Sequence, residues 1–265
     1  MLTRRPQCIG CNDGAVALPE FSMAFQPIVD TRTKTIFAYE ALARGIAGEP
    51  AAVVLGQVDD ANRYAFDQAC RVKAIELAVH AGLLDTAALL SINFLPNAVY
   101  SPVACIQTTL RTAEVNALPL DRLIFEFTEA EQMLSPKHVV SIIDCYRQMG
   151  FSVAIDDFGA GHAGLDLFAR FRPDTIKLDM ELVRGIDDDP RRRAIVRSVV
   201  GLCAELDTRL IAEGVETGEE ADTLALLGIR YMQGYLFARP AFEALPTVEL
   251  WDVALSHDRA KRNGP

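Results

Sequence analysis

Short apolar runs alternate along the chain with longer segments whose apolar residues recur every three or four positions. The short runs are typical of strands, and several are almost continuously apolar, as expected for strands covered on both faces. The predicted strands are residues 24–29, 36–42, 90–94, 123–128, 153–158, 175–180, 210–215 and 231–237.

The longer segments predict helices between most of these strands. Residues 66–84 and 138–149 carry helical spacing. A further helix is predicted to begin at Pro190, where Asp189 can cap the first turn and proline suits the first helical position. Its predicted apolar face contains Ile195, Val199 and Leu202.

Eight strands joined mainly by helices favour an α/β fold, a closed (β/α)8 barrel of the TIM type. A doubly wound open sheet is the alternative. Only residues 30–35 separate the first two strands, which leaves no room for a helix. These two strands are therefore predicted to be antiparallel, and the barrel to be irregular at its first strand.

The composition is that of an ordinary globular protein: 50% of the 265 residues are hydrophobic and 23% are charged, which excludes a disordered or fibrous chain. We expect three regions. Residues 1–20 form a flexible N-terminal arm, residues 21–250 form one domain, and residues 251–265 form a polar tail.

The charge balance limits the partners. Asp and Glu total 36 against 26 Lys and Arg, a net charge of −10, so no polymeric nucleic acid is expected to bind. A small phosphorylated ligand remains compatible, since metal ions could supply positive charge. No apolar run approaches the roughly 18 residues of a membrane span, and no signal peptide is recognisable, so we expect no membrane contact and a cytoplasmic location.

Cys8 and Cys11 form a CxxC pair within the predicted arm. One such pair supplies only two metal ligands, and no second pair or suitably spaced histidine accompanies it. Incidental thiols are the simplest interpretation, with a redox role or an intermolecular zinc contact left open.

Polar residues lie near the ends of several of the predicted strands. In a parallel barrel these ends meet at one rim, so residues far apart in sequence would converge there. Several carboxylates in one pocket repel each other, and Mg²⁺ or Mn²⁺ would suit their oxygens better than Zn²⁺. The residues are Glu40, Asn93, Glu126, Glu129, Asp156, Asp157, Lys177, Asp179, Glu213 and Glu216.

The adjacent residues Asp156 and Asp157 are the most specific indication of a metal site. Adjacent residues of a strand point to opposite faces, so both can reach one site only where the strand ends. We expect Gly159 and Gly161 to provide that break.

At this point the sequence resembles the EAL-domain cyclic-di-GMP phosphodiesterases. The resemblance covers roughly residues 21–245 and rests on seven motifs in order. They are FQPIV (25–29), EAL (40–42), FEFTE (125–129), DDFGAG (156–161), KLD (177–179), AEGVE (212–216) and QGYLFARP (233–240).

The resemblance implies metal-dependent hydrolysis of cyclic-di-GMP to linear pGpG by a metal-activated water, with two Mg²⁺ or Mn²⁺ ions per site. The implied metal ligands are Glu40, Asn93, Glu126, Asp156, Asp157 and Glu213. The implied catalytic residues are Lys177, Glu213, Gln233 and Glu129, the last as anchor of the loop after Asp157. The implied substrate contacts are Gln26, Leu42 and Arg44. A homodimer and a regulatory protein partner are also expected.

The loop after Asp157 departs from the commonest family sequence at two places. Ala160 replaces the usual threonine of the DDFGTG loop, which removes a hydroxyl but no metal ligand. His162 begins the run that replaces the frequent Tyr-Ser-Ser, and we expect it to be a solvent-facing loop residue.

Two alternative functions accompany this interpretation. A catalytically weak receptor or protein adaptor is the main alternative. An enolase-like barrel shares the strand-end acids, but a capping domain and a second candidate base lysine are lacking.

Overall fold

The computed structural model describes residues 17–96, 99, 101–128, 136–160, 164–170 and 172–248. Cys8, Cys11 and the predicted tail at residues 251–265 lie outside these ranges, as do the first sixteen residues of the predicted arm. No helix within the described ranges combines the length and the apolar character that crossing a membrane requires.

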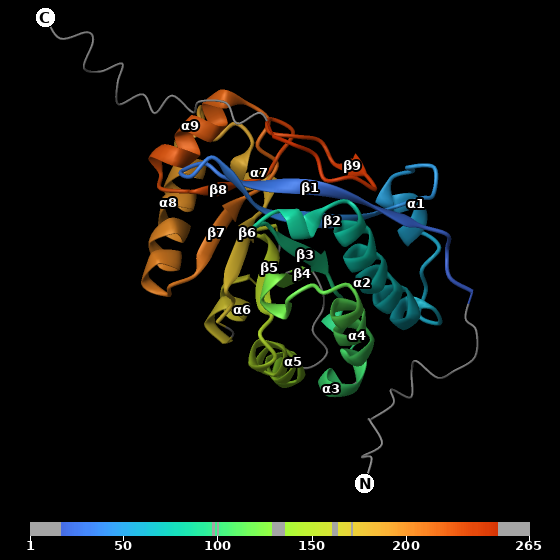
Figure 1. The fold of residues 1–265 in the computed structure, drawn as a ribbon. Helices are drawn as coiled ribbons and strands as arrows, with labels where there is room; N and C mark the ends of the chain where they lie inside the picture. The colour runs from blue at the N-terminus through green and yellow to red at the C-terminus, as the bar shows by residue number, and fades with distance from the viewer. Residues whose placement is uncertain are drawn as a thin grey trace, which may run out of the picture.

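In the described residues, eight strands close into a barrel, with β1 antiparallel between β2 and β8 (Figure 1). The six pairings from β2 to β8 are parallel. The mixed barrel is therefore confirmed, and the open-sheet alternative is wrong. The strands are β1 (Ser22–Asp30), β2 (Thr35–Arg44), β3 (Leu89–Asn93), β4 (Leu123–Thr128), β5 (Ser152–Phe158), β6 (Thr175–Leu178), β7 (Arg209–Ala212), β8 (Tyr231–Met232) and β9 (Ala241–Phe242), the last added to the edge of β1.

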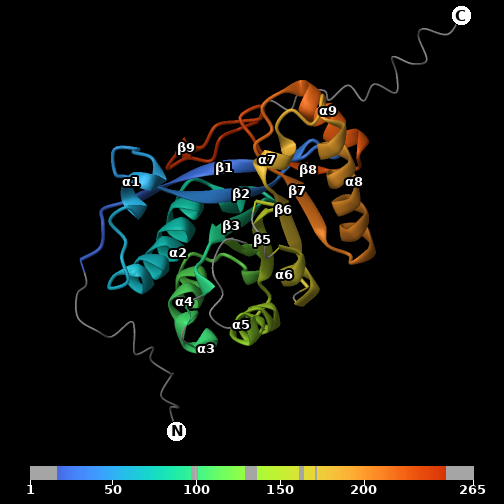
Figure 2. The same cartoon turned by 180° about the vertical axis from the view of Figure 1, so that it is seen from behind.

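Helices cover the outside of the barrel, as the views from front and back show (Figures 1 and 2). They are α1 (Ala51–Leu55), α2 (Arg63–His80), α3 (Pro102–Cys105), α4 (Gln107–Val115), α5 (Pro136–Gln148), α6 (Gly164–Arg170), α7 (Met180–Val183), α8 (Pro190–Glu205) and α9 (Gly218–Leu226).

Helix α8 begins as predicted, and Val199 of its predicted apolar face is buried, but Ile195 is not. The Asp189 carboxylate accepts hydrogen bonds from the backbone N–H groups of Arg191 and Arg192, so the cap is confirmed. The buried residues are Val196, Val199 and Cys203, whereas Ile195 is 48% exposed. The prediction for Ile195 was wrong because the helix is rotated by one position toward Val196.

Three strands end two or more residues earlier than predicted. β6 stops at Leu178 because the Asp179 side chain accepts from the Glu181 N–H at 2.8 Å and starts α7. β7 stops at Ala212, ahead of Gly214, whose φ of +67° leaves the extended conformation. β8 is reduced to Tyr231–Met232.

The barrel interior has an apolar layer and, beside it, a polar layer. Side chains alternate along a strand, so residues two apart share a face. Advancing by two residues from the apolar layer leads from Ala38 to Glu40, from Ile124 to Glu126, from Ala154 to Asp156 and from Ile211 to Glu213. The strand period therefore places four carboxylates at the carboxyl-terminal rim. The apolar layer consists of Ile28, Ala38, Ile124, Ala154 and Ile211.

Candidate active site

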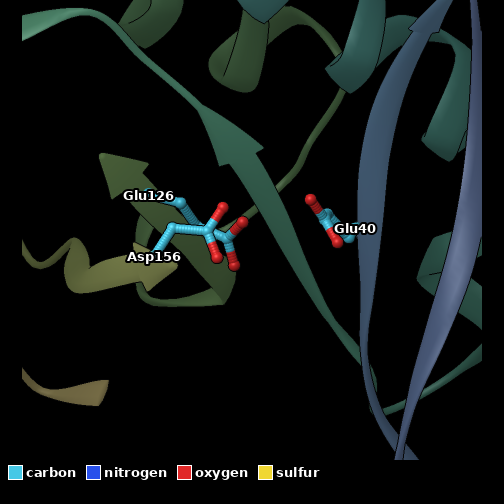
Figure 3. A group of neighbouring side chains, drawn as sticks. All are labelled: Glu40, Glu126 and Asp156. Atoms are coloured by element: carbon cyan, nitrogen blue, oxygen red, sulfur yellow. The ribbon is translucent and has the colours of Figure 1, made fainter. Parts of the chain in front are cut away.

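The carboxylates of Glu40, Glu126 and Asp156 converge from β2, β4 and β5. Ligand oxygens from these three residues lie within 4.8 Å of one another. In Figure 3 the Glu126 and Asp156 carboxylates stand side by side, and Glu40 faces them from its own strand. A second group with the same spacing consists of Asp156, Asp157 and Glu213. Asp156 belongs to both groups, so it lies where two cation positions would meet.

Lys177, from β6, lies among these acids with almost no exposed surface. Its Nζ atom is 2.9 Å from Glu126 Oε2, 3.0 Å from Asp156 Oδ1, 2.5 Å from Glu213 Oε1 and 3.4 Å from Glu40 Oε2. We call these five residues the Lys177 cluster. One ammonium thus faces four carboxylates, which leaves a net negative charge in a buried place.

Burial and the excess negative charge change pKa values within the cluster. Burial, together with the Glu40 and Asp156 carboxylates, raises the pKa of Glu126 to about 8 against the lowering effect of Lys177. Burial likewise raises the pKa values of Asp156 and Glu213. Burial disfavours the Lys177 ammonium, yet the surrounding carboxylates raise its pKa above the ordinary value. A bound divalent cation would favour the ionised carboxylates.

Asp157 reaches the site through a bulge. Between Ile155 and Phe158 the β5–β6 register shifts, and Asp157 has a φ of +54°. This left-handed residue turns its side chain to the side of Asp156, although adjacent strand residues normally point apart. The predicted convergence is therefore found, but its cause is a bulge before Gly159. Burial and the charge of Asp156 raise the pKa of Asp157 to about 6.

Amide side chains fix Glu40 from two directions. Gln233 Nε2 donates to Glu40 Oε2 at 2.7 Å, and Asn93 Nδ2 donates to Glu40 Oε1 at 3.2 Å. Gln233 Nε2 also lies 3.3 Å from Gln26 Oε1. The structure thus brings Asn93, Gln233 and Gln26 to the cluster that the sequence predicted.

Ser91 is a site residue that the sequence reasoning missed. Its Oγ donates to Glu126 Oε1 at 2.5 Å, and the residue is fully buried. The available signal was its place two residues before Asn93, on the same face of β3.

Other predicted residues lie elsewhere. Leu42 lines a larger cavity beside α2, which Asn93 also lines, and Arg44 Nη1 donates to the Ala43 carbonyl at the end of β2. Asp179 caps α7, and Glu216 pairs with Arg184 at 2.8 Å. Glu129 and His162 lie outside the described residues.

A cavity of about 160 Å³ adjoins the Lys177 cluster. Glu40, Glu213 and Gln233 lie on its inner side, and Met180 and Tyr235 extend its wall. The cavity connects buried carboxylates with surfaces that could contact a larger ligand.

The donor set fits a divalent cation. Carboxylate and amide oxygens are the ligands preferred by Mg²⁺ and Mn²⁺. Asp156 Oδ1 and Glu213 Oε1 are buried and accept no hydrogen bond of good geometry, although both face the Lys177 ammonium. One ammonium cannot neutralise these two carboxylates together with Glu40 and Glu126, so negative charge remains for a further cation.

Comparison with known proteins identifies the family. Residues 13–240 match the EAL domain. The chain belongs to the EAL domain family. The c-di-GMP-bound form of a standalone versatile EAL protein from Vibrio cholerae O395 superposes on this chain with a TM-score of 0.85, and the two sequences are 47% identical. That match covers 89% of this chain and 99% of the Vibrio chain.

Among relatives, the blue light- and temperature-regulated antirepressor BluF of Escherichia coli K12 is 35% identical over 85% of this chain and 55% of its own. Cyclic di-GMP phosphodiesterase RocR of Pseudomonas aeruginosa is 41% identical over 46% of this chain and 31% of its own. The chain therefore spans about half of the length of BluF and about a third of the length of RocR. The manganese and cyclic-diGMP complex of Klebsiella pneumoniae BlrP1 has a TM-score of 0.80 at 35% identity, over 88% of this chain and 58% of BlrP1.

Proposed function

We propose that this chain hydrolyses cyclic-di-GMP to linear pGpG with the help of two divalent cations. The observation that carries the proposal is the complete set of rim carboxylates around Lys177. Two similar proteins support the proposal. RocR is named a cyclic di-GMP phosphodiesterase, and BlrP1 forms a complex with manganese and cyclic-diGMP.

The ligands would divide between the two oxygen groups. Glu40, Glu126 and Asp156 would hold one cation with Asn93, and Asp156, Asp157 and Glu213 would hold the other. Bound Mg²⁺ or Mn²⁺ would supply Lewis acidity and activation of water for attack at phosphorus. In the overall reaction the water oxygen forms a bond to phosphorus, the P–O bond to one sugar oxygen breaks, and that released oxygen takes up a proton from the water.

The protein's own groups orient this chemistry. Lys177 places a positive charge beside the acids, where it can stabilise negative charge that develops on the phosphoryl oxygens. Gln233 and Asn93 hold Glu40 in one orientation through their amide donors. Gln26, Leu42 and Arg44 remain the proposed substrate contacts, with the Arg44 guanidinium suited to a phosphate.

The test is hydrolysis of cyclic-di-GMP by the purified protein in Mg²⁺, Mn²⁺ or EDTA, with products separated by chromatography. Formation of pGpG in either metal but not in EDTA is the expected result. Binding of the dinucleotide without any turnover in any metal would overturn the enzymatic proposal.

A second function is favoured by one observation, the name of the antirepressor BluF at 35% identity. On that alternative the chain binds a repressor protein through its surface and needs no turnover. Glu40→Ala would then leave partner binding intact, which a pull-down with the cognate repressor measures. A homodimer and a regulatory protein partner also belong to the proposal, and light scattering of the purified protein tests the dimer.

A further inference from the structure

A second buried ionic group lies behind the barrel wall, between α2 and the loop that follows β3. Asp67 and Arg71 stand one helical turn apart on α2 and form an ion pair through Oδ2 and Nη2. The Arg71 side chain has no exposed surface, and that of Asp67 is 4% exposed. Neither side chain belongs to the Lys177 cluster.

The other oxygen of Asp67 holds the backbone next to Asn93. Asp67 Oδ1 accepts a hydrogen bond from the Leu95 N–H at 3.0 Å. The intervening residue, Phe94, donates its N–H to the Glu126 carbonyl at 2.9 Å. The two backbone amides after Asn93 are therefore fixed in succession, one by β4 and one by α2.

Packing leaves room for this loop to move. A cavity of about 390 Å³ is lined by Asp67, Asn93, Phe94 and Leu95, together with apolar side chains of β2 and α2. A loop beside open space depends more on its hydrogen bonds than a loop enclosed by close packing. Arg71 matters here because it holds Oδ2, which leaves Oδ1 directed at Leu95.

We propose that Asp67, oriented by Arg71, is a positioning residue for the cation site: it fixes the Leu95 backbone and thereby the place of the Asn93 side chain. This inference rests on the proposed function, in which Asn93 is a cation ligand. Groups behind metal ligands commonly alter metal affinity by about 10- to 100-fold when removed. Asp67 acts through two further residues, so a smaller effect is expected.

The test compares two double variants that both lack the buried charges. Asp67→Asn with Arg71→Met keeps an acceptor for the Leu95 N–H, whereas Asp67→Leu with Arg71→Met removes it. Mn²⁺ binding is measured without substrate from the electron paramagnetic resonance signal of free Mn²⁺. The expected result is a dissociation constant within about twofold of wild type for the Asn variant and about five- to tenfold weaker for the Leu variant.

Equal Mn²⁺ affinity in the two double variants would overturn the inference. Asp30→Asn is the matched control. It removes the ion pair of Asp30 with Arg230 at the carboxyl-terminal end of β1, and it should leave Mn²⁺ affinity unchanged. If the Leu variant does not fold, Asp67→Glu keeps the charge but displaces the acceptor, and unchanged Mn²⁺ affinity in it would equally overturn the inference.

The two proposals fail in different ways. Wild-type protein that binds Mn²⁺ and hydrolyses the dinucleotide, with unaffected double variants, refutes only the role of Asp67. Wild-type protein that binds no Mn²⁺ refutes the cation site itself, and the positioning role with it.

Discussion

Two buried ionic groups in the described part of the chain differ in charge balance. In the Lys177 cluster one ammonium faces four carboxylates, whereas Asp67 and Arg71 form a one-to-one pair. Both lie in places where an unpaired charge is expensive. A balanced pair needs no further charge, but an excess of carboxylates requires a further cation. Charge imbalance therefore distinguishes a binding site from a structural pair at similar burial.

The pKa values reflect this difference. Burial and the neighbouring acids raise the pKa of Glu126 to about 8, so part of the cluster resists ionisation. Burial also disfavours the charge of Arg71, but the Asp67 carboxylate outweighs it and raises the arginine pKa. Arg71 therefore keeps its charge, whereas Glu126, Asp156 and Glu213 need a bound cation to stay ionised.

Removing a carboxylate from the unbalanced group should have the largest effect. Glu40→Ala or Asp156→Asn is expected to lower turnover of cyclic-di-GMP by at least about 10³-fold, because a proposed cation position loses a ligand. The measurement is pGpG formation at saturating Mn²⁺. Asp121→Asn, at an exposed carboxylate before β4, serves as control. Retained turnover in both site variants would remove the basis of the comparison.

Breaking the balanced pair should instead lower stability. Asp67→Ala leaves the Arg71 charge buried without its carboxylate counter-ion, so the free energy of unfolding should fall by about 3–5 kcal/mol. Removing both charges with Asp67→Leu and Arg71→Met should cost much less. Urea denaturation of the three proteins measures the difference. A double variant as unstable as Asp67→Ala would mean that lost packing, and not the unpaired charge, causes the effect.

Cation binding should stabilise the folded protein only through the unbalanced group. A cation held by the folded chain alone adds about 2.7 kcal/mol at a concentration 100 times its dissociation constant. Thermal unfolding in Mn²⁺ against EDTA should thus show a rise in Tm for wild type. Asp156→Asn should abolish most of that rise, because Asp156 is shared by both oxygen groups. An unchanged rise in that variant would place the cation elsewhere.

Much of the fold and the convergence of the acids followed from the short apolar runs and from the polar residues near their ends. Alternation places Glu126 above Ile124 and Asp156 above Ala154, so strands and rim acids could be predicted together. The short link before residue 36 correctly indicated the antiparallel start.

What escaped prediction depends on contacts between distant segments. The bulge at Asp157 is a register shift between two strands, and the bond from Leu95 to Asp67 joins residues 28 positions apart. Local spacing contains neither. The exposed face of α8 at Ile195 was missed for a related reason, since Val196 is equally apolar and only packing on the barrel selects between them.

A third ionic group, Asp30 with Arg230, is a balanced pair that is partly exposed. Arg230 Nε donates to Asp30 Oδ1 at 2.7 Å, and the arginine side chain is 38% exposed. Burial acts to raise the pKa of Asp30, but hydrogen bonds from Arg230 and from Thr33 outweigh it and lower the pKa to about 2. The ordinary value is 3.8, so the folded state binds this proton more weakly than the unfolded state does.

The stabilisation by Asp30 should therefore be complete well above pH 3.8 and be lost as the pH falls toward about 2. Because solvent screens the exposed arginine, Asp30→Asn should cost only about 1 kcal/mol at neutral pH. Urea denaturation of wild type and variant at a series of pH values measures the difference between them. That difference should shrink in acid, since the wild-type carboxyl becomes neutral like the amide. A constant difference would mean that Asp30 stabilises the hairpin through hydrogen bonding alone, and charge balance would then matter only for fully buried pairs.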